Sequence, residues 1–180
     1  MSEKEAIRKR WQETPMLTPK IRKVTVNISV GKSGEPLEKA AKVLEQLTDR
    51  KPVKRKARKT IRDFGIRKGE PISCVVTLRK DKTVEFLTKA LQAVDNQIPK
   101  DHFDAEGNVS FGIKEHIEIP GTRYVPELGI FGMDISVALG RAGYRVKERR
   151  RGKSKIGKRH LLTPEEAMVF VEDTLEVEVV

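Results

Sequence analysis

The sequence predicts an α+β fold: a single antiparallel-rich sheet with two to three helices packed on one face, plus protruding basic loops. Alternating apolar and polar stretches recur along the chain, amphipathic helical stretches separate them, and basic residues gather in two segments that follow neither pattern. For a chain of 180 residues we expect one domain at 16–180, preceded by a polar arm at 1–15 that forms a short helix or a loose segment.

The first half of the chain predicts three strands and two helices. Residues 23–30 (KVTVNISV) and 72–79 (ISCVVTLR) alternate as half-buried strands do, and 53–56 is a candidate short strand. Residues 37–47 and 83–96 carry apolar side chains at helical spacing. The expected inward positions of the second helix are Val84, Leu87, Leu91 and Val94.

The second half predicts two further strands, a third helix and a closing strand. The strands are expected around 109–119 and at 133–139, and the basic stretch 141–160 is expected to be a loop. Thr163 followed by Pro164 and two glutamates is typical of a helix start, and 176–179 closes as a strand. The predicted order is β-α-β-β-α-β-β-α-β.

Positive charge is concentrated in two segments. The chain has a formal net charge of +11 and a pI near 9.8, whereas 50–68 and 141–160 each hold ten basic residues and one acid. Such segregation predicts a polyanion-binding face, and arginine's planar fork suits phosphate. An anionic membrane is the weaker alternative, because neither segment has an amphipathic apolar face. With little apolar sequence to hold them, both segments are expected to become ordered only on RNA.

Several classes of protein fit poorly. The single cysteine, Cys74, excludes an internal disulfide framework and is predicted in the core of its strand. The three histidines are dispersed, and only His116, beside Glu115 and Glu118, suggests a site. No apolar run approaches the ~20 residues that span a bilayer, so we expect a soluble intracellular protein. We also expect no metal, no cofactor and no enzymatic activity.

The polar faces of the two clearest strands are the most informative feature. They are expected to display Thr25, Asn27 and Ser29 on one strand, and Ser73, Thr77 and Arg79, with Val75, on the other. Hydroxyl and amide groups can bond 2′-OH and sugar oxygens across the shallow minor groove of an A-form helix. The absence of exposed aromatics on these strands favours a reader of folded RNA shape. An ordinary solvent-facing sheet explains the same pattern equally well.

Longer motifs carry a family resemblance. The segment KVTVNISVGKSGEPLEKAAKVLEQLTDRKPVKRKARKTIRDFGIRKGEPI resembles the N-terminal half of the large-subunit ribosomal protein five family. The later segments FGIKEHI, GIFGMDISVALGR-GY and IGKRH…EEA resemble its archaeal and eukaryotic branch. The resemblance implies a structural constituent of the large subunit in the cytoplasmic ribosome. It would bind 5S rRNA, anchor it in the central protuberance and contact the P-site tRNA through a basic loop.

The resemblance also implies partners and site residues. The partners are 5S rRNA, large-subunit rRNA, P-site tRNA and neighbouring ribosomal proteins, one of them on the small-subunit head, with no membrane. On the strands it implies rRNA binding by Lys23, Thr25, Asn27, Ser29, Thr77 and Arg79, to which the strand-face pattern adds Ser73. In the loop at about 54–70 it implies tRNA proximity for Arg55, Lys56, Arg58, Lys59, Thr60 and Arg62. Further rRNA contact is expected in 141–160 from Arg141, Arg145, Arg149, Arg150, Arg151, Lys155 and Lys158.

Two other functions remain open from the sequence. An RNA-processing or RNA-modifying enzyme would use the same basic surface with His116 and its neighbouring acids. A general DNA-binding protein is the third possibility, although no helix-turn-helix or zinc pattern supports it.

Overall fold

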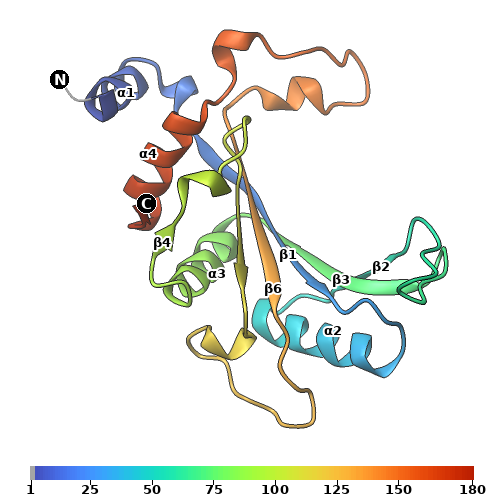
Figure 1. Cartoon of the computed structure of the whole chain (residues 1–180). Coiled ribbons are helices and arrows are strands. Elements are labelled where there is room, and N and C mark those ends of the chain that lie inside the picture. Colours follow the sequence, from blue (N-terminus) through green and yellow to red (C-terminus); the bar gives the residue numbers. More distant parts are fainter. Residues whose placement is uncertain (1–2) are drawn as a thin grey trace. The chain divides into compact units, whose positions relative to one another are not determined.

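The computed structural model, which describes residues 3–180, contains a five-stranded sheet (Figure 1). Its spatial order is β2-β3-β1-β6-β5, and β3 pairs antiparallel with both β1 and β2. The strands are β1 Lys20–Ser29, β2 Val53–Lys56, β3 Pro71–Leu78, β5 Val109–Ile113 and β6 Met133–Gly140. The predicted α+β fold with an antiparallel-rich sheet is confirmed.

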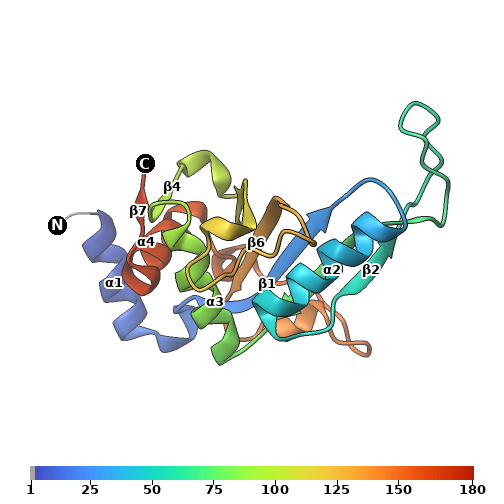
Figure 2. The same ribbon diagram turned by 90° about the horizontal axis from the view of Figure 1, so that it is seen from below.

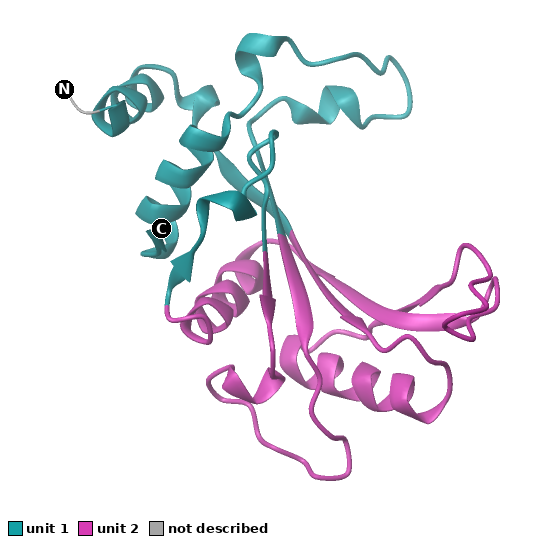
Figure 3. Cartoon of the chain, in the orientation of Figure 1, with its two compact units in different colours: residues 1–23, 96–110, 137–180 teal, residues 24–95, 111–136 magenta. Residues whose placement is uncertain are grey.

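The chain divides into two compact units (Figure 3). Unit 1 combines the N-terminal part up to Lys23 with residues 96–110 and 137–180, and unit 2 combines 24–95 with 111–136. The boundaries fall within β1, β5 and β6, so each of these strands contributes residues to both units.

Unit 2 contains two amphipathic helices, α2 Glu35–Thr48 and α3 Asp81–Gln92. α2 packs against β3, and Figure 2 shows it lying along the strands of its unit. The strands alternate as predicted, since every second side chain is buried from Val24 onward in β1 and from Cys74 onward in β3. The buried strand residues are Val24, Val26, Ile28, Cys74, Val76 and Leu78.

Unit 1 contains α1 Glu3–Glu13 and α4 Pro164–Leu175. α4 starts as the sequence predicted: the Thr163 side chain accepts the Glu166 N–H while the Glu166 carboxylate accepts the Thr163 N–H, so two orphan donors are satisfied. The polar arm forms helix α1, which packs on α4 through buried Ile7 and an edge-to-face contact of Trp11 with Phe170. Ion pairs join the same two helices: Lys4–Glu172, Arg8–Asp173 and Arg10–Glu166.

Short elements complete the chain. β4 Gln97–Ile98 pairs in parallel with β7 Glu178–Val179 in a separate two-stranded sheet, so the closing strand does not join the main one. The 3-10 helices are η1 Pro15–Leu17, η2 Lys100–His102, η3 His116–Glu118, η4 Tyr144–Lys147 and η5 Lys158–His160. Within residues 3–180, no helix combines the length and apolar character needed to cross a membrane.

Two local expectations were wrong. The strand expected over 109–119 ends at Ile113, and η3 follows it. On α3, Val84 is exposed while Thr83, Phe86 and Ala90 are buried beside Leu87 and Leu91, so the buried face is rotated from the predicted one.

Candidate nucleic-acid interface

The polar side chains of β1 and β3 share one open face of unit 2. The register pairs Thr25 with Thr77 and Ser29 with Ser73, and residues opposite one another in an antiparallel ladder point to the same side. Asn27 lies opposite Val75 on that side. Because the alternate residues of both strands are buried against helices, the predicted juxtaposition of hydroxyl and amide groups is present.

The Asn27 amide is held in place on this face. Its Nδ2 donates to Ser29 Oγ at 3.0 Å and to Asp134 Oδ2 at 3.3 Å. Both amide hydrogens are therefore directed within the protein, which fixes the plane of the side chain and the direction of its carbonyl oxygen. Asp134, on β6, is a functional candidate that the sequence did not suggest.

A hollow of about 540 Å³ opens beside this network. Gly112 and Gly132 line it, together with the side chains of Ser29, Lys114 and Asp134. A Cβ on Gly132 would lie 2.9 Å from the carbonyl oxygen of Lys114, so the backbones approach there more closely than a side chain permits. The open face is thus concave at this edge, with one cation and one anion at its rim.

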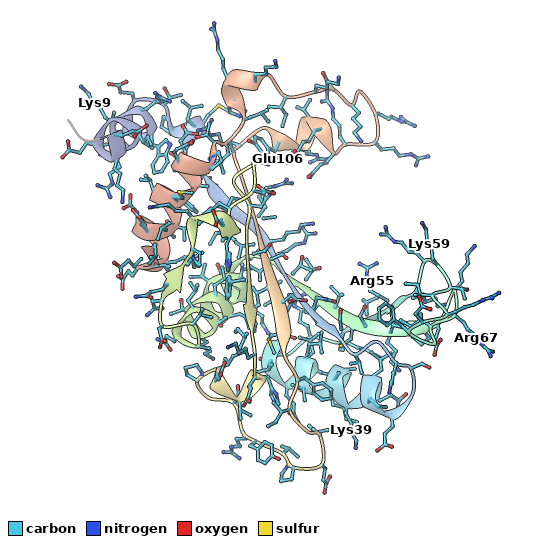
Figure 4. All side chains as sticks on the ribbon, in the orientation of Figure 1. Lys9, Lys39, Arg55, Lys59, Arg67 and Glu106 are labelled. Atoms are coloured by element: carbon cyan, nitrogen blue, oxygen red, sulfur yellow. The ribbon has the colours of Figure 1, made fainter. Side chains whose placement is uncertain are left out.

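The predicted tRNA-proximal residues lie on β2 and the loop after it. Arg55 pairs with Ser73 in the β2–β3 register, so its side chain joins the open face, whereas Lys54 points to the helix side and pairs with Glu38 at 3.2 Å. Figure 4 labels Arg55, Lys59 and Arg67 on β2 and this loop. The exposed candidates are Arg55, Lys56, Arg58, Lys59, Thr60 and Arg62.

Hydrogen bonds within the protein join the backbone of this basic loop. The Ile61 and Ile66 backbones bond each other at 2.9 and 3.0 Å, and Thr60 Oγ1 accepts the Lys68 N–H at 3.0 Å, so Thr60 is also a structural clasp. At the base, Glu70 accepts from the Ser33 hydroxyl and the Arg67 N–H, which lowers its pKa. The tip exposes 73% of Phe64, an aromatic ring that the sequence pattern did not single out.

Arg141 is not exposed as an RNA contact would be. Its side chain is 2% exposed and its guanidinium forms a buried ion pair with Glu166 of α4. Nη1 also donates to the carbonyl oxygens of His160 and Leu161, at 3.3 and 3.1 Å. We therefore leave Arg141 out of the proposed interface and regard it as a structural residue of unit 1.

Tyr144 anchors the rest of 141–160, contrary to the expectation that nothing apolar holds it. The ring is buried, and its hydroxyl accepts the Leu162 N–H at 2.8 Å and donates to the His160 carbonyl oxygen at 3.4 Å. Lys147 Nζ lies 5.0 Å from the ring centroid. The segment is irregular apart from η4 and η5, but these bonds give it a defined conformation.

Ion pairs within unit 1 use some of the charges in this segment. Arg22 pairs with Glu148 at 2.5 Å, which lowers the pKa of Glu148 and raises that of Arg22, and Lys147 pairs with Glu106 at 3.3 Å. The other predicted candidates are exposed: Arg145, Arg149, Arg150, Arg151, Lys155 and Lys158. On the strands, Lys23 and Arg79 are also exposed.

His116 has a structural environment. Its Nδ1 accepts the Phe131 N–H at 3.3 Å, which helps to hold the turn before β6, and burial lowers the pKa of the ring. The geometry gives it a backbone partner rather than an acid–base pair with Glu115 or Glu118. Among residues 3–180, no group of three or more His, Cys, Asp or Glu residues is arranged to hold a metal ion.

Comparison with known proteins identifies the family of this chain. The sequence profile described as "Ribosomal protein L5" matches residues 14–67, and a second profile, which describes the C-terminus of the same ribosomal protein family, matches residues 71–171. Three relatives carry the name "Large ribosomal subunit protein uL5". The protein of Pyrobaculum aerophilum is 57% identical over 165 residues, covering 92% of both chains. That of Aeropyrum pernix is 53% identical over 93% of this chain and 88% of the relative, and that of Methanosphaera stadtmanae 46% identical over 90% and 96%. The chain therefore belongs to the ribosomal protein L5 family, a family of structural and non-enzymatic proteins, and to its archaeal branch.

Proposed function

We propose that this protein is a structural component of the large ribosomal subunit that binds 5S rRNA through the open face of its sheet and anchors it in the central protuberance. The observation that carries the proposal is the face itself. Paired hydroxyls from β1 and β3 flank the oriented Asn27 amide in a single layer. Such groups suit ribose hydroxyls and base edges of folded RNA. The names of the relatives support assembly into the large subunit of the cytoplasmic ribosome.

The basic segments supply the second part of the proposal. The cations of β2 and its loop approach the P-site tRNA, and the exposed cations of 141–160 contact rRNA. Support comes from their exposure, from the family resemblance and from the absence of neutralising acids within each run except Asp63 and Glu148. On the resemblance alone, we extend the proposal to neighbouring ribosomal proteins, including one on the small-subunit head.

A binding experiment tests the open face. The double variant Asn27→Ala, Thr77→Ala should weaken 5S rRNA binding by about 1–3 kcal/mol, or roughly 5- to 150-fold in Kd, because each lost hydrogen bond contributes about 0.5–1.5 kcal/mol. The matched control is Thr88→Ala, an exposed threonine on α3 of the same unit. Unchanged affinity in a folded double variant would contradict docking through this face.

A competition experiment tests the ligand. The purified chain is titrated with 5S rRNA against tRNA and duplex DNA across a salt series. Selective binding of 5S rRNA that persists at about 150 mM salt is expected, since non-specific attraction to phosphate is strongly weakened there. Equal and weak binding of all three nucleic acids would show only non-specific attraction between a cationic protein and phosphate, and would refute the proposal.

A further inference from the structure

Four arginines surround a hollow in the 141–160 segment of unit 1. The hollow measures about 500 Å³ and is lined by Gly143, Arg145, Val146, Arg149, Arg150 and Arg151. We call it the arginine hollow. Four arginines thus lie within seven consecutive residues and line one concave surface.

The backbone around the arginine hollow is held in shape by the protein. The Ser154 N–H donates to the Val146 carbonyl oxygen at 3.2 Å and closes the loop, while the Arg149 N–H donates to the Arg145 carbonyl oxygen at 2.8 Å. Arg149 Nε donates to the Gly152 carbonyl oxygen at 2.7 Å, across a turn in which Gly152 has φ +60°. Below the loop, buried Tyr144 bonds the Leu162 backbone. A site shaped before binding loses less conformational entropy when a ligand enters.

The acidic residue nearest to these arginines in the sequence forms an ion pair with a residue outside the hollow. Glu148 is the one acid of 141–160, and its carboxylate pairs with Arg22 at 2.5 Å. Among the residues that the structure describes, none of the four arginines forms an ion pair with an acid. The arginines that line the hollow therefore have no acidic counter-ion in the described part of the protein, and an anionic ligand could supply one.

We propose that the arginine hollow binds phosphates crowded together at a sharp bend of an RNA strand, an assignment that rests on the proposed function. One phosphate is bound by one or two guanidinium groups, so four arginines that line a single concavity suit more than one phosphate. Consecutive phosphates of a regular helix are spaced along the strand and follow a convex surface. Where the strand bends sharply, phosphates approach one another and repel, and a concave cluster of arginines offsets that repulsion.

The test compares a bent RNA with a straight one. The probes are an RNA hairpin whose stem is kinked by a short unpaired bulge and the same hairpin without the bulge, titrated with the full chain. The hollow variant is Arg150→Gln, Arg151→Gln; the control, Lys153→Gln, Lys155→Gln, removes the same charge outside the hollow. We expect the wild-type chain to prefer the bent RNA by about tenfold, in line with one good bidentate contact, and the hollow variant to lose that preference. The control should bind both RNAs more weakly and by the same factor.

A charge-conserving variant separates geometry from charge. Arg150→Lys, Arg151→Lys keeps the net charge but not the planar forks, so it should also lose most of the preference for the bent RNA. Equal losses in the hollow and control variants would overturn the proposal, as would tighter binding of an acidic peptide such as polyglutamate than of either RNA. A 5S rRNA titration in parallel distinguishes the failures. If the wild-type chain selects 5S rRNA but the hollow variants keep the wild-type preference for bent over straight RNA, only the assignment of the hollow fails. If the wild-type chain does not select 5S rRNA, the proposed function fails.

Discussion

The buried ion pair between Arg141 and Glu166 offers a quantitative test of how unit 1 is held together. The side chains are 2% and 6% exposed, and Glu166 also accepts the Thr163 N–H in the capping box of α4. Glu166→Ala leaves the guanidinium of Arg141 buried without its counter-ion. Breaking such a pair costs about 3–5 kcal/mol, which is a large share of the roughly 5–15 kcal/mol by which a native protein is stable.

Thermal and urea unfolding measure the effect. For a chain of this length a loss of 3–5 kcal/mol corresponds to a fall in Tm of about 6–20 °C. The matched control is Glu165→Ala, the exposed neighbour on the same helix, which should change stability by less than about 0.5 kcal/mol. The double variant Arg141→Met, Glu166→Leu replaces the pair with apolar groups and should recover much of the loss.

The same variants test whether Arg141 is structural. If it is, the apolar double variant should bind 5S rRNA with the same salt dependence as the wild-type chain, because Arg141 makes no bond to phosphate. A Glu166→Ala protein as stable as the Glu165→Ala control would refute the reasoning. If the double variant shows a lower slope of log K against log salt than the wild-type chain, Arg141 contacts phosphate and belongs to the RNA interface.

Three further outcomes follow from local structure. Burial lowers the pKa of His116, so the unfolded chain binds the proton more readily; Tm should fall as pH drops from about 7.5 to 5, and His116→Gln should reduce that dependence. Thr163→Ala removes the side-chain acceptor of the Glu166 N–H and should cost about 1 kcal/mol in urea unfolding. Phe64→Ser removes an exposed ring, so it should leave Tm unchanged while weakening protection of P-site tRNA in ribosome footprinting; unchanged protection would exclude a stacking role for the ring.

Strand faces could be predicted because their signal is local. Side chains of a strand alternate between its two faces with a period of two residues, so Val26 and Asn27 point to opposite faces wherever the strand lies in the fold. The β1–β3 register then brings Thr25 and Thr77 together. The start of α4 was predictable for the same reason, since Thr163 and Glu166 are three residues apart.

Features that depend on distant partners could not be predicted. Arg141 counts as one more cation in the sequence, and only the fold shows that Glu166, 25 residues later, neutralises it. Asp134 meets Asn27 across 107 residues. Helix α1 has only a short apolar face, and its ion pairs with α4, such as Lys4–Glu172, join residues that are far apart in the sequence. On α3 the error was one of phase, since Val84 and Phe86 are both apolar and packing decides which is buried.

Asp134 raises a physical question about the proposed interface, because a carboxylate repels phosphate. Its position 3.3 Å from the Asn27 amide nitrogen is useful only where the partner is a ribose hydroxyl or a base edge, which an oriented amide can recognise. The sheet face and the basic segments would then contribute differently: the face discriminates among RNAs, and the segments supply the attraction to phosphate.

That division predicts two different salt responses. Asn27→Ala should weaken 5S rRNA binding by a similar factor at every salt concentration, because a neutral amide releases no counter-ions. Lys155→Ala, Lys158→Ala, in the segment proposed to contact rRNA, should lower the slope of log K against log salt by about one for each phosphate that is no longer neutralised, and weaken binding to unrelated RNAs as well. The control Lys42→Ala, Lys89→Ala removes exposed helical cations of unit 2 and should leave the slope unchanged. A reduced slope for Asn27→Ala would mean that the face binds phosphate after all, and Asp134 would then have no place in it.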